Sequence, residues 1–372
     1  MARGVAKLLV LLAVIMAACE SSPRTPELAS ASSLDARSGP ARYVAVRVGN
    51  GPIVTPASDP SIGQNIQGPS LIRVPDWVEN RLGRYYLYFA DHKGRYIRLA
   101  YADKVEGPWK IHAPGALRLE QTRFPQTPPP YAADEMAAYR ERAKANGVDL
   151  DQFPDVAKEM TTPHIASPDV HVDEENKRIV MYHHGLEGFA QQVTRVAIST
   201  DGIHFAPGEE VLGRTYWRAF PHNGMTYALA MPGVLYRSDN PLSGFEQGPT
   251  LFNPDMRHSA VFKRGATLHV IWTQVAAEPP ERLLMSTIDI SGPWETWKES
   301  PPVEILRPEK SWEGANLPLQ KSARSFAAGR VNQLRDPAIF EEDGRIWLLY
   351  AIAGESGIGL AELKVESQSV LP

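Results

Sequence analysis

The 372-residue chain lacks several features that would define a function directly. It contains one cysteine, Cys19, so no disulfide can form within the chain. Its formal charge of −4 provides no basic face for nucleic acid. The sequence contains no nucleotide-binding loop, Gly-x-Ser-x-Gly elbow, His-Glu-x-x-His motif, calcium-loop spacing or other metal-ligating motif. The hydrophobic content of 43% is nevertheless enough for a large core in one or two domains.

The first 18 residues have the pattern of a targeting segment. Arg3 and Lys7 precede the apolar run LLVLLAVIMAA, which is too short to span a membrane comfortably. Met16-Ala17-Ala18-Cys19 resembles the lipobox of bacterial lipoproteins. This predicts cleavage before Cys19, lipidation of Cys19, and location in the bacterial cell envelope on the periplasmic face or outer membrane. The alternative is an ordinary secretory signal. Residues 19–42, rich in Ser, Pro and Ala, are expected to form a flexible linker.

A pattern of short strands recurs five times from residue 65 onward. Its clearest copies are GRYYLYFADHKGRYIRLAYA in the first block and RDPAIFEEDGRIWLLYAIAG in the last. Apolar residues alternate at the period of a strand rather than that of a helix. Four short strands per repeat predict an all-β, five-bladed β-propeller over residues 43–372. The early strand YVAVRVGN, residues 43–50, is expected to close the ring against the last block.

Two insertions interrupt the repeats, at about residues 118–163 and 305–333. The first is predicted to contain one helix, from about Ala132 to Asn146. Each insertion leads into the first strand of the next blade, and long loops in compact domains are often functional. Both are therefore candidate walls of a binding cleft, with simple decoration of the rim as the alternative.

Polar side chains are expected to meet at one mouth of the ring. The inner strand of each blade should begin there, and the antiparallel second strand should end there. The candidate catalytic residues are Asp336, Asp169, His258, Glu355 and Glu187. The candidate substrate-binding residues are Arg335, Arg257, Arg218, His92, His184, Trp217 and Trp312. Carboxylates and histidines can move protons, arginines match anionic groups, and tryptophans stack on sugars. Ion pairing, solvated loop charge and core packing are the alternative roles. Because adjacent strand residues face opposite ways, only one of His183 and His184 should reach the site.

The five repeats, the lipoprotein-like start and Arg335-Asp336-Pro337 resemble the five-bladed propeller glycosidase superfamily of arabinanases, xylosidases, invertases and levansucrases. SPDVHVDEENKRIVMYHHG resembles a second-blade segment of arabinanase-like enzymes. The resemblance implies axial carboxylates acting as general base, general acid and a third tuning group, with Ca²⁺ possible on the axis. This chain departs from the pattern, because Gly68 precedes the blade-one proline and Ser167 the blade-two proline.

The expected function is hydrolysis of a glycosidic bond in an oligosaccharide or polysaccharide, and the arginines would also suit an anionic substrate. One alternative is a polysaccharide lyase, in which His258 or His92 with a tyrosine would remove a proton while arginines neutralise a uronate. Another is a sugar-binding lipoprotein without catalysis. The fold alone does not decide among them.

Overall fold

The computed structural model describes residues 41–145, 150–151, 153, 155–327 and 329–366. Residues from Arg42 onward form one compact unit. The predicted signal segment, Cys19 and residues 19–40 of the expected linker lie outside the described residues. In the part of the chain that the structure describes, no helix is long and apolar enough to cross a membrane.

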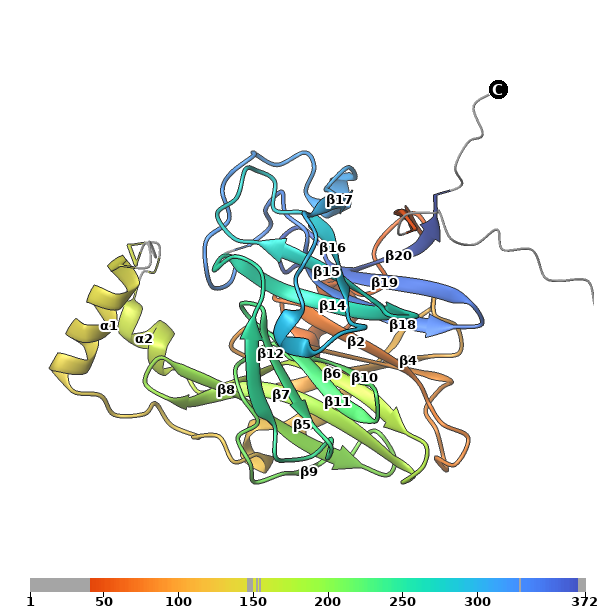
Figure 1. The fold of residues 1–372 in the computed structure, drawn as a ribbon, viewed down its shortest axis with the longest axis horizontal. Coiled ribbons are helices and arrows are strands. Elements are labelled where there is room, and N and C mark those ends of the chain that lie inside the picture. Colours follow the sequence, from red (N-terminus) through yellow and green to blue (C-terminus); the bar gives the residue numbers. More distant parts are fainter. Residues whose placement is uncertain (1–40, 146–149, 152, 154, 328, 367–372) are drawn as a thin grey trace, which may run out of the picture. The chain divides into compact units, whose positions relative to one another are not determined.

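The described strands form five four-stranded antiparallel sheets, which confirms the predicted five-bladed propeller (Figure 1). Blade one contains β2 (Gln67–Arg73), β3 (Tyr85–Ala90), β4 (Tyr96–Ala102) and β5 (Lys110–Arg118). Blade two contains β6 (Ile165–Asp173), β7 (Arg178–Gly188), β8 (Gln191–Ser199) and β9 (Ala206–Pro207). Blade three contains β10 (Arg218–His222), β11 (Met225–Ala230), β12 (Val234–Ser238) and β13 (Glu246–Thr250). Each of these sheets is built from consecutive strands, as the sequence repeats predicted.

The last two blades show how the ring closes. Blade four contains β14 (Met256–Arg264), β15 (Thr267–Gln274), β16 (Leu283–Asp289) and β17 (Val303–Leu306). Blade five contains β18 (Arg335–Glu342), β19 (Arg345–Ala351), β20 (Ile358–Val365) and the early strand β1 (Tyr43–Arg47). β1 pairs antiparallel with β20, so the start of the unit supplies the outer strand of its last blade, as expected. This pairing ties the two ends of the unit together.

Each blade is buried on both faces, because it packs between two neighbours. In β3 all six residues are buried. Tyr86 and Tyr88 belong to the apolar cluster shared with blade two, whereas Leu87 and Phe89 belong to the cluster shared with blade five. Alternate residues of one strand therefore enter two different cores, and the hydrophobic effect holds the ring together around its circumference.

The recurrent X-Pro dipeptides mark bulges in the inner strands. Gly68, Ser167 and Asp336 each precede a proline and have φ of +62°, +46° and +46°. The strand register shifts at all three positions. Glycine adopts this left-handed conformation without strain, but serine and aspartate pay about 1–2 kcal/mol for it. The bulge turns the backbone where the inner strand begins, and so decides which side chains face the ligand mouth.

The two insertions carry little regular structure. The first contains α1 (Ala133–Ala145), close to the predicted helix, and a short helix, α2 (Val156–Thr161), that was not predicted. Among its described residues, the second contains a single turn of 3-10 helix, η5 (Ser311–Glu313). Glu313 anchors this turn, since its buried carboxylate accepts hydrogen bonds from Arg47 and from the hydroxyl of Tyr350 at 2.8–2.9 Å.

Candidate active site

Polar side chains from several blades meet where the inner strands begin, and they form what we call the axial polar cluster. Its members are Asn65, His92, His184, Tyr216, Arg257, His258, Glu281, Arg335, Asp336 and Glu355. Six of the twelve predicted catalytic or substrate-binding residues lie here. Five of them contact another of the five, Arg257 shares the carboxylate of Glu281 with Arg335, and His184 joins them through Tyr216. The convergence predicted from strand order is therefore present, although not for every candidate.

Asp336 and His258 form the centre of the cluster. Nδ1 of His258 lies 2.7 Å from an Asp336 carboxylate oxygen, and the two side chains are 4% and 2% exposed. Burial alone would raise the pKa of Asp336, but His258, Arg257 and Arg335 outweigh burial and hold that pKa below its ordinary value. Burial lowers the pKa of His258, and Asp336 opposes that effect only in part. Asp336 is thus built to stay ionised.

Glu355 has the opposite electrostatic character. It follows the second strand of blade five, and its residue is 2% exposed. Burial raises the pKa of Glu355; Arg335 opposes this and the negative charge of Asp336 adds to it. Nη1 of Arg335 donates to one carboxylate oxygen at 2.8 Å, and the side-chain amide of Asn65 donates to the other at 2.6 Å. Glu355 is thus a positioned carboxyl group that retains a proton more readily than Asp336.

Glu281 is a buried carboxylate that the sequence analysis missed. Its side chain is fully buried, 3.6 Å from Arg257 and 3.4 Å from Arg335. Neither of its carboxylate oxygens makes a hydrogen bond to the described residues. It precedes β16 after the dipeptide Pro279-Pro280, and its position in a loop outside the strand repeat left no signal to find it. It balances the charge of the two arginines that hold the site.

Aromatic rings line one side of the cluster. Tyr216, with φ of +59°, places its ring 4.6 Å from that of His258 and 4.4 Å from that of His184. Tyr216 was not among the predicted residues; its neighbour Trp217 was predicted to stack on the sugar instead. His184 reaches the site, whereas His183 turns away and packs edge-on against Phe124. This alternation agrees with the expectation for adjacent strand residues.

Both insertions cover the axial polar cluster. Arg257 donates to the carbonyl oxygens of Ala323 and Ser325, each at 3.1 Å, and Arg335 donates to that of Ser325 at 3.3 Å. The hydroxyl of Ser325 donates to Glu159 at the end of the first insertion and lies 3.2 Å from Nε2 of His92. The expected cleft walls therefore meet directly above the site.

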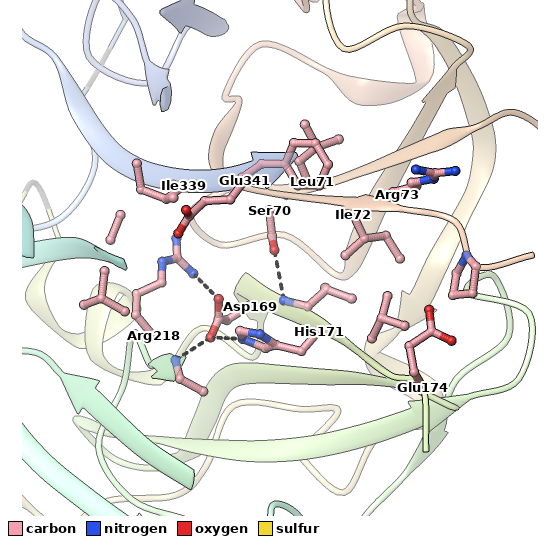
Figure 2. A pocket seen from close by; sticks show the side chains of 18 of the residues that line it. Ser70, Leu71, Ile72, Arg73, Asp169, His171, Glu174, Arg218, Ile339 and Glu341 are labelled. Carbon is pink, nitrogen blue, oxygen red and sulfur yellow. Dashed lines mark hydrogen bonds and ion pairs between the residues drawn. The ribbon is translucent and has the colours of Figure 1, made fainter. Parts of the chain in front are cut away.

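Asp169 and Arg218 lie elsewhere on the axis, which corrects the expectation that they join Asp336. Asp169 accepts hydrogen bonds from the backbone N–H of Ala219 at 2.7 Å and from His171 at 2.8 Å. It also lies 3.7 Å from Arg218. Figure 2 shows the side chains of Asp169, His171 and Arg218 together. They line a cavity of about 540 Å³ that is formed by the later residues of the inner strands. Asp169 follows its proline whereas Asp336 precedes its own, and this offset sends the two carboxylates to different parts of the axis.

Arg218 fills the centre of the ring. Its guanidinium donates to the carbonyl oxygens of Ser259 at 2.8 Å, Pro168 at 3.0 Å and Pro337 at 3.5 Å, and so joins the inner strands of blades four, two and five. Carbonyl oxygens are also ligands that Ca²⁺ requires. Because a protein cation already binds these oxygens, the residues at this point of the axis do not fit the Ca²⁺ ion that the resemblance implied. Among the described residues, no group of three or more His, Cys, Asp or Glu side chains could hold a metal.

Three further candidates lie outside the cluster. Trp217 is 1% exposed and packs against Tyr182 and Tyr236 in the core, so it is no platform for a sugar. Trp312 packs against the apolar core of blades four and five. Glu187 accepts two hydrogen bonds from Arg195, both at 2.9 Å. For these residues, the alternative roles of packing and ion pairing describe the contacts that the structure shows.

Comparison with solved structures confirms the fold. A putative glycoside hydrolase from Bacteroides ovatus matches with a TM-score of 0.54 and 12% identity, over 88% of this chain and 98% of that one. A family-43 β-xylosidase/α-arabinofuranosidase from a compost metagenome, solved with xylotriose, matches at 0.50 and 12%, over 86% and 94%. A family-43 enzyme from Xanthomonas citri matches at 0.50 and 9%, over 88% and 92%. These likenesses establish the five-bladed architecture.

Sequence comparison gives a nearer relative. No protein-family model matches the chain. The uncharacterized protein R118 of Acanthamoeba polyphaga mimivirus is 35% identical over 326 residues, which cover 80% of this chain and 83% of that protein. At this identity and coverage, the chain belongs to the same protein family as mimivirus R118, a family built on the five-bladed propeller.

Proposed function

We propose that the protein is a glycoside hydrolase and that the axial polar cluster is its active site. The observation that carries the proposal is the pair of buried carboxyl groups whose pKa values are shifted in opposite directions, Asp336 down and Glu355 up. Hydrolysis of a glycosidic bond requires one carboxyl group that can donate a proton and one that stays ionised, and these opposite shifts favour the two roles. The fold shared with solved glycoside hydrolases supports the same chemistry.

Each group has a defined task in this reaction. Glu355 donates its proton to the glycosidic oxygen as the bond from the anomeric carbon to that oxygen breaks. Asp336 stabilises the positive charge that develops on the sugar ring and accepts a proton from the incoming water as its oxygen bonds to the anomeric carbon. Exchange with solvent then returns both carboxyl groups to their starting protonation, so that the net change is addition of one water. His258 fixes the orientation of Asp336 at 2.7 Å, and Arg335 fixes that of Glu355 at 2.8 Å.

The decisive test is the mass of the products. The purified protein would be incubated with neutral, uronic and sulfated oligosaccharides, and the products would be analysed by mass spectrometry. Fragments whose summed mass exceeds that of the substrate by one water are expected. Binding without any product across the panel would favour a sugar-binding protein and overturn the hydrolase.

A lyase is the second candidate, because Tyr216 lies against His258 and next to Arg257. In β-elimination a base would remove the proton at C5 of a uronate, and the C4–O bond would break to leave an unsaturated end. That product absorbs ultraviolet light and carries no added water. Tyr216→Phe should abolish elimination but leave hydrolysis within a few fold, so this variant separates the two reactions.

We also propose that Cys19 carries a lipid that anchors the protein to a bacterial envelope membrane, on the pattern Met16-Ala17-Ala18-Cys19. Metabolic labelling with palmitate in a bacterial host would test it. Label is expected in the full chain and absent from Cys19→Ser; equal labelling of both would overturn the anchor.

A further inference from the structure

Residues 322–327 of the second insertion, which we call the strap, occupy the axial polar cluster from outside. The carbonyl oxygens of Ala323 and Ser325 accept hydrogen bonds from Arg257, and that of Ser325 accepts another from Arg335. The hydroxyl of Ser325 contacts both Glu159 and His92. Two acceptor oxygens and one hydroxyl from the chain itself thus satisfy the polar groups that face outward from Asp336 and Glu355.

Two further side chains of the strap hold it in this position in addition to its contacts with the cluster. Arg324 pairs with Asp255 at 2.5 Å and donates to the carbonyl oxygen of Pro254 at 3.2 Å. Ser322 accepts a hydrogen bond from the backbone N–H of Ala276 at 3.1 Å. Ser325 has φ of +75°, a conformation that is unfavourable for a residue with a side chain. A strained residue at a binding site is typical of a segment whose position matters for function.

We propose that the strap occupies the position of a substrate. The subsite beneath it takes the hydroxyl and ring oxygens of a neutral saccharide and is formed by Arg257, Arg335, His92 and Glu159. The strap must withdraw before the saccharide can bind. This inference rests on the proposed function and names the substrate class of the same site. The strap supplies neutral oxygens, and a saccharide supplies oxygens of the same kind, both accepting from arginine and donating to Glu159.

The charges around the two arginines favour a neutral ligand over a uronate. Arg257 lies 3.6 Å from Glu281, and Arg335 lies 3.4 Å from the same carboxylate. Asp336 adds a further negative charge that acts on both arginines. Glu281 and Asp336 thus balance the two arginines, and Glu159 at the outer edge is balanced by Lys93 at 3.4 Å. An additional carboxylate on the ligand would therefore find no free positive charge.

Chemical labelling of histidine tests the strap without any need for catalysis. Diethyl pyrocarbonate modifies accessible, neutral imidazole. The side chain of His92 is 11% exposed beneath the strap, whereas that of His204 is 83% exposed on a distant loop and serves as internal reference. Arg324→Ala removes a latch outside the cluster. If the open state rises from about 10% to about half of the molecules, labelling of His92 relative to His204 should rise about fivefold.

A matched variant controls for the loss of a surface arginine. Arg264→Ala removes a similarly exposed ion pair, with Glu341 at 2.6 Å on an inner strand. It should leave the labelling of His92 unchanged. A second opening variant, Ser325→Ala, removes only the hydroxyl contact and guards against misfolding of the first. Unchanged labelling of His92 in both strap variants, with the fold intact by circular dichroism, would overturn the proposal that the strap opens over the site.

The ligand class is tested on the opened protein with two probes, xylotriose and trigalacturonic acid. Xylotriose is expected to protect His92 in Arg324→Ala, and to bind that variant about fivefold more tightly than wild type because less free energy is needed to open the strap. Protection by trigalacturonic acid alone, or by neither probe, would overturn the neutral-saccharide subsite. Protection by xylotriose without turnover of any oligosaccharide would instead overturn the hydrolase and leave the subsite standing.

Discussion

Asp336 and Asp169 both lie on inner strands beside a proline, yet the ring places them in different settings. Asp336 precedes Pro337, takes a left-handed backbone conformation and faces His258 in the axial polar cluster. Asp169 follows Pro168 and is held in the axial cavity by Ala219, His171 and Arg218. The carboxylate of Asp336 adjoins a second carboxyl group that can hold a proton, whereas that of Asp169 contacts partners that keep it ionised. The comparison shows that position relative to the bulge separates a candidate catalytic carboxylate from a structural one.

The largest expected effect is on turnover in Asp336→Asn. The amide cannot stabilise positive charge on the sugar or accept a proton, so kcat should fall about 10³-fold. Turnover of the oligosaccharide found by mass spectrometry would be measured alongside circular dichroism, which should show a folded protein. Activity equal to that of wild type would show that Asp336 is not catalytic, and Asp336 would then no longer differ from Asp169 in role.

Glu355→Gln should reduce kcat by about 10²-fold on a natural substrate, because the leaving group no longer receives a proton. An activated aryl glycoside, whose leaving group needs no proton, should be cleaved at nearly the wild-type rate. In wild type, activity should fall as pH rises through the raised pKa of Glu355, and the variant should lack this limb. Glu187→Gln, which removes a carboxylate paired with Arg195, is the control and should retain both rate and pH profile.

Asp169→Asn should act on stability rather than on chemistry. Replacing the buried carboxylate leaves Arg218 without its ionic partner, at a cost of about 3 kcal/mol in the free energy of unfolding. Denaturant unfolding would measure the loss, and kcat per folded molecule should remain near that of wild type. A large fall in kcat at unchanged stability would show that Asp169, like Asp336, takes part in the reaction, and would contradict the structural role given to Asp169.

The smallest effect concerns the pH dependence of stability. Burial would lower the pKa of His171, but Asp169 outweighs it and leaves the pKa raised. The protonated ring therefore stabilises the fold below its unfolded pKa of about 6.5, and this contribution is lost as pH rises through the folded pKa. His171→Asn should consequently lower Tm more at pH 5.5 than at pH 9. The same loss of Tm at both pH values in His171→Asn would contradict the ion pair.

Most of the predicted cluster could be found from strand order, and the failures share a physical cause. His92, Arg257, His258, Arg335, Asp336 and Glu355 lie at strand ends that the alternation of apolar residues locates. Asp169 was misplaced because a bulge changes which residues face the mouth, and sequence alternation does not report the phase after a bulge. Trp217 and Arg218 follow Tyr216, whose left-handed backbone turns the chain just before the inner strand of blade three, so Tyr216 reached the site whereas Trp217 entered the core.

The amino-acid sequence by itself determined the number of blades, the closure of the last blade by the first strand and the helix of the first insertion. These depend on local alternation, turn residues and helix-forming composition, which the order of residues contains. Only the tertiary structure decided that Glu281 lies between two arginines, that Ser325 covers them and that Glu355 and Asp336 differ in pKa. Those properties depend on burial and on charges brought from distant blades, and desolvation exists only once the ring has closed.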